Sequence, residues 1–124
     1  MEVDERLIKQ LVQLAIENDI ERHIDEIRDF YDKLIDVSLY KKGANASEEK
    51  ENKKWAYNRV ARELLIIRER LIRVKEKIEN AKLAPECKKS FDREVKRCQK
   101  TYDAWAAKCK EVLRDWDDEL LKEL

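Results

Sequence analysis

Apolar residues recur every three or four positions along most of the chain, which is the period of an amphipathic helix. The most regular run of the first forty residues consists of Ile20, Ile24, Ile27, Tyr31 and Leu34. This spacing predicts a first helix over residues 3–41, with one face turned toward a core.

The first half of this predicted helix carries its apolar residues on a rotated face. A seven-residue frame cannot join the two halves, whereas an 11-residue frame places Val12, His23 and Leu34 in one column. Such a frame predicts a nearly straight helix. A break near residues 18–19 is the alternative.

Two more helices are predicted, over residues 48–82 and 85–124. The seam of the former consists of Tyr57, Val60, Leu64, Ile67, Leu71, Val74, Ile78 and Ala81. The latter shows an 11-residue repeat with two neighbouring columns. These columns are Cys87, Cys98, Cys109 and Leu120, and Phe91, Tyr102, Leu113 and Leu124, with Trp105 and Trp116 beside them. Both patterns are typical of helices that face a core.

The breaks between the predicted helices coincide with the only glycine and the only proline of the chain. Gly43 is predicted to stop the first helix, with Lys41 and Lys42 at its negative end. Asn45 and Ser47 are both candidate N-caps for the second helix.

The third helix is predicted to begin at Pro85, because proline suits the first position of a helix. Connections of a few residues make neighbouring helices antiparallel. The sequence therefore predicts an all-α fold, an elongated, coiled-coil-like antiparallel three-helix bundle in a single domain over residues 1–124. A two-helix hairpin that completes its core by dimerisation is the structural alternative.

Composition also indicates a compartment. No stretch approaches the apolar length of a membrane span, and the first residues lack the basic flank and apolar run of a signal peptide. Cys87, Cys98 and Cys109 are spaced by 11 residues on one predicted helix, about 16 Å between neighbours, which is too far for a disulfide. We therefore expect a non-secreted protein of the reducing cytoplasm, with no membrane partner.

Charge is balanced in total but unevenly distributed. The chain has 28 basic and 28 acidic residues, with a net charge of −6 in residues 1–40, +10 in residues 41–110 and −4 in residues 111–124. An acidic first helix packed beside a basic second helix explains this distribution, and a basic surface for an acidic partner is the alternative. Overall neutrality argues against a nucleic-acid partner.

The only histidine, His23, falls on an apolar face of the first predicted helix. Counting from the predicted breaks places it level with Leu64 or Leu65 and near Tyr102. Because a buried imidazole needs a hydrogen bond, a His23–Tyr102 pair is predicted. Together with Trp105, these two residues form a candidate buried polar or ligand pocket.

Signals for catalysis or metal binding are weak. The chain has no Gly-rich phosphate loop, no H-E-x-x-H and no C-x-x-C motif. One histidine cannot form a zinc site without a partner such as Cys98 or Cys109, whose spacing suits core positions better. Cys87 is expected to be the reactive thiol, because a helix N-terminus lowers a thiol pKa. We predict no metal, no cofactor and no enzymatic activity.

One face of the second predicted helix is a candidate partner-binding surface. It consists of Trp55, Arg59, Arg62, Ile66, Arg70 and Arg73. Trp and Arg are enriched where proteins bind proteins. Ordinary surface residues, or stacking on single-stranded nucleic acid, are the alternatives. Further apolar residues outside the predicted core are Leu7, Leu14, Leu39 and Tyr40.

Two short segments resemble a known family. The run Asp-Glu-Ile-Arg-Asp-Phe-Tyr-Asp-Lys-Leu at residues 25–34 resembles the first helix of the N-terminal three-helix domain of syntaxins, and residues 105–110 are similar to its third helix. This resemblance implies a regulatory bundle that binds a protein partner.

The composition has features of both designed and natural proteins. Matched charge totals and minimal loops are features that protein design favours, whereas free cysteines and polar or aromatic residues near the core are features that it avoids. Designed or engineered and natural origins both stay open. We expect a non-enzymatic protein–protein interaction module or helical scaffold that binds an unidentified protein or itself. A small-molecule or haem-binding bundle is the alternative.

Overall fold

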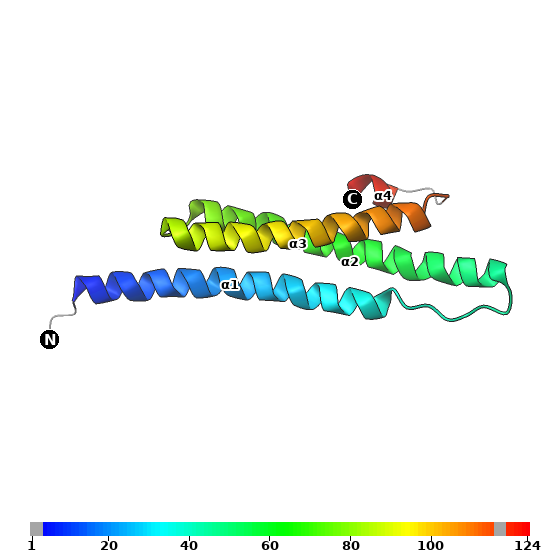
Figure 1. Cartoon of the computed structure of the whole chain (residues 1–124), viewed down its shortest axis with the longest axis horizontal. Helices are drawn as coiled ribbons and strands as arrows, with labels where there is room; N and C mark the ends of the chain where they lie inside the picture. The colour runs from blue at the N-terminus through cyan, green and yellow to red at the C-terminus, as the bar shows by residue number, and fades with distance from the viewer. Residues whose placement is uncertain (1–3, 116–118) are drawn as a thin grey trace.

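The computed structural model describes residues 4–115 and 119–124. Three long helices, α1 (Glu5–Val37), α2 (Ala46–Asn80) and α3 (Pro85–Val112), lie side by side, and a short α4 (Glu119–Glu123) follows. Successive long helices run in opposite directions (Figure 1). The predicted all-α, antiparallel three-helix bundle is confirmed. None of the described helices is long and apolar enough to cross a membrane.

The core lies along the predicted apolar seams. All five residues of the regular run on α1 are buried, and so are six of the eight seam residues on α2, Tyr57 and Ala81 being partly buried. From α3 the core receives Val95, Cys98, Tyr102, Ala106 and Cys109. One chain therefore encloses its own core, and the alternative of a hairpin completed by dimerisation is wrong.

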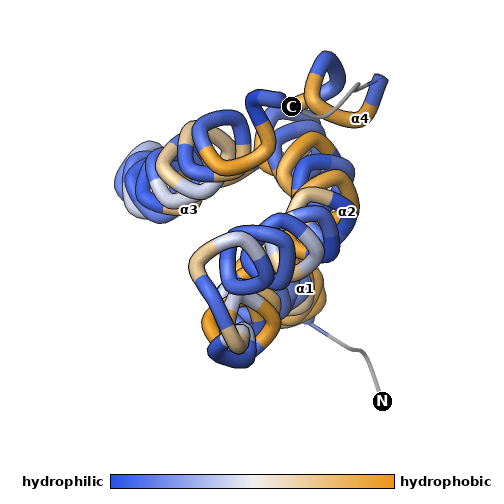
Figure 2. Tube along the Cα trace, turned by 90° about the vertical axis from the view of Figure 1, so that its right-hand side faces the viewer, coloured by the Kyte–Doolittle hydropathy of each residue, from blue (hydrophilic) through white to orange (hydrophobic). Residues whose placement is uncertain are grey.

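The central helix is α2, which packs along both of its neighbours (Figure 2). Contacts between α1 and α3 are fewer. The Tyr31 hydroxyl donates to the Cys98 carbonyl oxygen at 2.6 Å, and Arg28 forms an ion pair with Glu94. These two pairs join α1 and α3 in parallel, as two antiparallel steps along the chain require.

The first helix is continuous through residues 18–19, so the alternative of a break there is wrong. It ends at Val37, four residues before the predicted end. The Ser38 hydroxyl donates to the Ile35 carbonyl oxygen at 2.7 Å, which satisfies a carbonyl that the last turn leaves unpaired. Lys41 and Lys42 therefore lie beyond the helix and cannot act on its dipole.

The connection between α1 and α2 lies against the start of α2. The Asn52 side-chain amide donates to the Lys41 carbonyl oxygen at 3.1 Å. A Cβ atom on Gly43 would lie 2.7 Å from the Glu48 Cβ, so only glycine allows this close approach. The prediction that Gly43 stops α1 is wrong, because its role is to let the connection contact α2.

The N-termini of α2 and α3 form largely as predicted. Asn45 is the N-cap of α2, and its side-chain oxygen accepts from the Glu48 backbone N–H at 2.9 Å. The Glu48 carboxylate accepts from the Ala44 N–H at 3.1 Å, which makes this arrangement a variant of the capping box. Ser47 is thus not the cap, and Pro85 opens α3 as predicted.

The prediction that the third helix extends to residue 124 is wrong. The helix ends at Val112, and α4 packs beside α2. Arg68 donates to the Glu123 carbonyl oxygen, and the side chains of Leu120, Leu121 and Leu124 pack on the core. The spacing of these leucines fits one continuous helix and a separate α4 equally well. The spacing alone therefore cannot predict that the chain leaves the helix after Val112 and that α4 packs against α2. The predicted position of Trp116 lies outside the described residues.

Helices α1 and α2 are displaced relative to each other along their length. Asp19 is opposite Lys77 and Glu26 is opposite Arg70, which places Asn80, the last residue of α2, opposite Ile16. Residues 5–15, here called the α1 extension, project past the turn between α2 and α3 (Figure 1). The non-helical connection of residues 38–45 causes this displacement. Non-helical chain spans up to about 3.3 Å per residue, against 1.5 Å in a helix, so the connection carries α2 further from the end of α1 than a helix of the same length would.

Candidate functional site: the α1 extension and its groove

The α1 extension exposes an unusual number of large apolar side chains. Five of them lie within eight residues, with exposed fractions between 46% and 57%. They are Leu7, Ile8, Leu11, Val12 and Leu14. Exposed apolar residues are ordinary when they are scattered, but a contiguous group marks a surface that binds something.

Where α1 packs on the bundle, its outward side is polar. Leu7, Leu11 and Leu14 form one stripe along the helix, and Asn18 and Arg22 continue it at the same spacing. The leucines lie in the extension and are exposed, whereas the two polar residues lie where α2 covers the opposite side of α1. The outward stripe is therefore apolar only where α1 has no neighbouring helix.

A groove of about 650 Å³ lies where the α1 extension meets the end of α2. The α1 side of the groove contributes Val12, Ala15, Ile16, Asp19 and Ile20, and the α2 side contributes Arg73, Glu76, Lys77, Asn80 and Ala81. Its lining is mainly apolar, and charged groups stand at its edge. The group of five exposed apolar side chains adjoins the groove, because Val12 belongs to both.

The charges at the groove edge are of two kinds. Lys77 donates to Asp19 at 2.6 Å, and this contact lowers the pKa of the Asp19 carboxyl. Arg73 and Glu76 form no ion pair or hydrogen bond with any described side chain. The groove therefore offers one cation and one anion that are not neutralised within the described chain.

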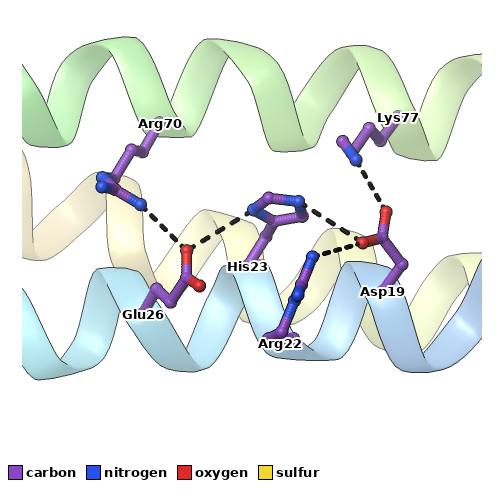
Figure 3. A network of polar contacts seen from close by, with 6 residues as sticks. All are labelled: Asp19, Arg22, His23, Glu26, Arg70 and Lys77. Carbon is purple, nitrogen blue, oxygen red and sulfur yellow. Dashed lines mark hydrogen bonds and ion pairs between the residues drawn. The ribbon is translucent and has the colours of Figure 1, made fainter.

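His23 lies between two carboxylates on the α1–α2 boundary (Figure 3). Its Nε2 is 3.6 Å from Asp19 and its Nδ1 is 3.7 Å from Glu26. Both carboxylates are also held from α2, Asp19 by Lys77 and Glu26 by Arg70 at 2.9 Å. These ion pairs join the two helices. Within residues 4–115 and 119–124, no group of three or more His, Cys, Asp or Glu side chains is placed to hold a metal ion.

The predicted His23–Tyr102 hydrogen bond is wrong. The offset of α1 places His23 opposite residues 73–74 of α2 instead of Leu64 or Leu65. Tyr102 is buried in the core from α3, and its hydroxyl has no well-oriented hydrogen-bond partner among the described residues. Burial raises the pKa of Tyr102, and the nearby Arg68 guanidinium opposes this effect.

Trp105 is half-buried and lines a different groove. This groove has a volume of about 520 Å³ and is formed with Tyr57, Lys100, Thr101, Ala104 and Lys108. His23, Tyr102 and Trp105 thus lie in three different surroundings, which gives the predicted ligand pocket no common site.

The three cysteines are unpaired. Cys98 and Cys109 are buried, as predicted, and burial raises the pKa of Cys109 to about 12. The pKa of Cys87 is also raised, by partial burial and by the Glu17 carboxylate. The expectation of a lowered Cys87 pKa is wrong, because both effects raise it.

Part of the predicted partner surface on α2 is taken up by the contact with α1. Trp55 and Ile66 are exposed by 59% and 44%, and Arg59 and Arg62 are exposed as well. Arg70, however, binds Glu26 and lies 4.8 Å from the centre of the Phe30 ring. Arg70 therefore belongs to the α1–α2 contact and is not available to a partner.

The α1 extension was missed as a surface by sequence reasoning, although Leu7 and Leu14 were placed outside the core. The rotation of the N-terminal apolar stripe was the available signal. Apolar residues that lie on a different side of a helix from its core residues cannot pack against the same neighbouring helices, so they are left exposed.

Comparison of the chain with protein-family models, with curated proteins and with solved structures finds no match. The resemblance to syntaxin N-terminal domains thus receives no support from a family match.

Proposed function

We propose that this protein is a non-enzymatic protein–protein interaction module that binds its partner through the α1 extension. The observation that supports this proposal is the group of five half-exposed apolar side chains on a helix segment without a neighbouring helix. An isolated helical segment of about 11 residues is marginal in water. Covering its apolar face would stabilise the segment and bury the exposed area together.

The amphipathic face suits another helix. Leu7, Leu11 and Leu14 follow the spacing of four and three residues that helix-in-groove recognition uses. The adjoining groove offers additional apolar contact at Val12 and Ile16. We therefore propose a helical protein segment as the binding partner, in a reducing compartment such as the cytoplasm, where three unpaired cysteines persist.

A photo-crosslinking amino acid at position 11 tests this proposal in cells that produce the chain. Mass spectrometry should find a polypeptide crosslinked to position 11, either another protein or this chain, and the Leu7→Lys substitution should abolish the product. The control position is Lys89, which is exposed on α3. An equal yield from position 89, or no product from position 11, would refute the proposal.

The α2 surface is proposed as a second contact for an acidic partner segment. Arg59, Arg62 and Arg73 are exposed cations beside Ile66, and arginine forks pair well with carboxylates. Changing Trp55 and Ile66 to Ala, and measuring stability and binding together, tests this surface. A large loss of stability would mean that the two residues belong to the folded core, and the proposal would be wrong.

A further inference from the structure

We propose that the groove beside Trp105 binds a small planar aromatic molecule that carries an anionic group such as a carboxylate, sulfonate or phosphate. This groove, here called the Trp105 groove, has a volume of about 520 Å³ and is formed by Tyr57 of α2 and by residues of α3. The α3 residues are Lys100, Thr101, Ala104, Trp105 and Lys108. The site is separate from the α1 extension, so it goes beyond the proposed function and does not depend on it.

Trp105 lies on the side of α3 that faces α1. Glu94 marks this side, because it forms an ion pair with Arg28 of α1. Trp105 follows Glu94 by 11 residues, which is about three helical turns, so the two side chains leave α3 in nearly the same direction. The groove is therefore a continuation of the α1–α3 boundary.

At the level of Trp105, however, α1 has already ended (Figure 1). The Tyr31 hydroxyl donates to the Cys98 carbonyl oxygen, which places these two residues at about the same level. Val37, the last residue of α1, lies six residues beyond Tyr31, so it is level with about residue 104 of the parallel α3. Among the described residues, neither α1 nor the connection after it contributes to the groove lining. The early end of α1 thus leaves this side of α3 uncovered.

The apolar part of the groove suits an aromatic ligand. Tyr57 and Trp105 are partly buried against the core, and both line the groove. Aromatic rings pair favourably in offset-stacked and edge-to-face arrangements, so a planar ring system gains specific contacts here. The volume of the groove lies within the range of about 300–1,000 Å³ that is typical of small-molecule sites.

The charges of the groove suit an anion. Lys100, Ala104 and Lys108 are spaced by four residues, so they form one row along α3 with the alanine in the middle. The two lysines are about 12 Å apart along the helix, close enough for both long side chains to contact one ligand. Lys100 forms no ion pair or hydrogen bond with a described residue, and the ion pair of Lys108 with Glu111 is long, at 3.9 Å. An anionic group above Ala104 would thus have a cation on either side while its ring contacts Trp105.

The balance of charge in the lining supports the same ligand class. Among the residues that the structure describes, no acidic side chain lines the groove. The Thr101 hydroxyl donates to the Arg97 carbonyl oxygen at 3.1 Å, so its proton is used within α3. The two ammonium groups therefore remain as the donors for a ligand, and an anion is favoured over a neutral or cationic molecule.

NMR titration of the ¹⁵N-labelled chain with naphthalene-2-sulfonate tests the proposal. The chemical-shift changes should centre on the Trp105 indole N–H and on the backbone amides of residues 100–108, with a dissociation constant on the order of 1 mM or below. The matched probe is naphthalene-2-methanol, which has the same rings and no charge, and it should bind about 5-fold more weakly. Equal affinities for the two probes, or no change at Trp105, would overturn the proposal.

Charge removal on α3 separates a defined site from general attraction. Lys100→Gln combined with Lys108→Gln should weaken sulfonate binding about 5-fold or more and leave the binding of naphthalene-2-methanol unchanged. The control combines Lys89→Gln with Lys96→Gln, which are exposed positions on the same helix, and it should leave both affinities unchanged. An equal loss in the two double variants would show attraction to the net charge of α3, and the proposed site would be wrong.

Discussion

The Lys77 ammonium lies 2.6 Å from the Asp19 carboxylate, and this contact marks how far α1 is displaced along α2. With Asp19 opposite Lys77, the residues before Ile16 have no counterpart on α2. The same displacement separates His23 from the level of Tyr102. The exposed apolar extension and the failure of the predicted polar pair therefore have one cause.

The Asp19–Lys77 pair should make stability depend on pH in the acid range. Its contact with Lys77 lowers the pKa of Asp19 below the ordinary value of 3.8. A lowered carboxyl pKa stabilises the folded state above the unfolded pKa, and the contribution is lost as pH falls through the folded pKa. Thermal unfolding of Asp19→Asn should thus begin slightly lower than that of the wild type at pH 6, and the difference should vanish near pH 2. A constant difference across this range would show that Asp19 acts through something other than its charge.

Replacing Ile67 with Ala should remove a fully buried side chain from the centre of α2. We expect the free energy of unfolding to fall by about 2–5 kcal/mol, because the change loses buried apolar area and leaves a cavity. The neighbouring Ile66 is 44% exposed, so Ile66→Ala should change the free energy by no more than about 0.5 kcal/mol. Urea titration of both variants measures the difference. Similar losses would place Ile66 in the core.

Tyr31 and Tyr102 offer a matched pair of hydroxyl deletions. The Tyr31 hydroxyl donates to the Cys98 carbonyl oxygen, whereas the buried Tyr102 hydroxyl lacks a well-oriented partner. Tyr31→Phe should lower the free energy of unfolding by about 1 kcal/mol, and Tyr102→Phe should be neutral or stabilising, because an unpaired buried hydroxyl is unfavourable. Chemical denaturation of the two variants measures both changes in the free energy of unfolding. A larger loss for Tyr102→Phe would contradict the described hydrogen bonding.

Cys109 should make the protein less stable in alkali. Burial raises its pKa from the ordinary value of 9.0 to about 12. A raised thiol pKa leaves stability intact below the unfolded pKa and removes it as pH rises through the folded pKa. The free energy of unfolding should therefore decline between about pH 9 and pH 12, and less steeply in Cys109→Ala. Parallel pH profiles for the two proteins would show that the thiol does not contribute.

The core of the bundle could be predicted because it depends on local periodicity. Ile20 through Leu34 repeat at the helical spacing, and a helix that buries one face must bury those residues. The cap at Asn45 and the start at Pro85 were predictable for the same reason, since each depends on its own chemistry at one position.

The relative placement of the helices could not be predicted in the same way. The end of α1 at Val37 depends on the Ser38 hydroxyl and on the fit of Gly43 against α2, which are contacts between distant elements. The reversal after Val112 likewise depends on where Leu120 and Leu124 find apolar contact. The predicted end of α1 was four residues too late, and the connection that follows is extended instead of helical. Together these two differences account for the wrong predicted level of His23 along α2.

The most direct test of the central claim is photo-crosslinking from position 11 in cells that produce the chain, with the exposed position 89 on α3 as the control. Because the α1 extension is proposed as the binding surface, position 11 should capture a polypeptide, position 89 should not, and Leu7→Lys should abolish the product. No product from position 11, or an equal yield from position 89, would contradict binding through the α1 extension.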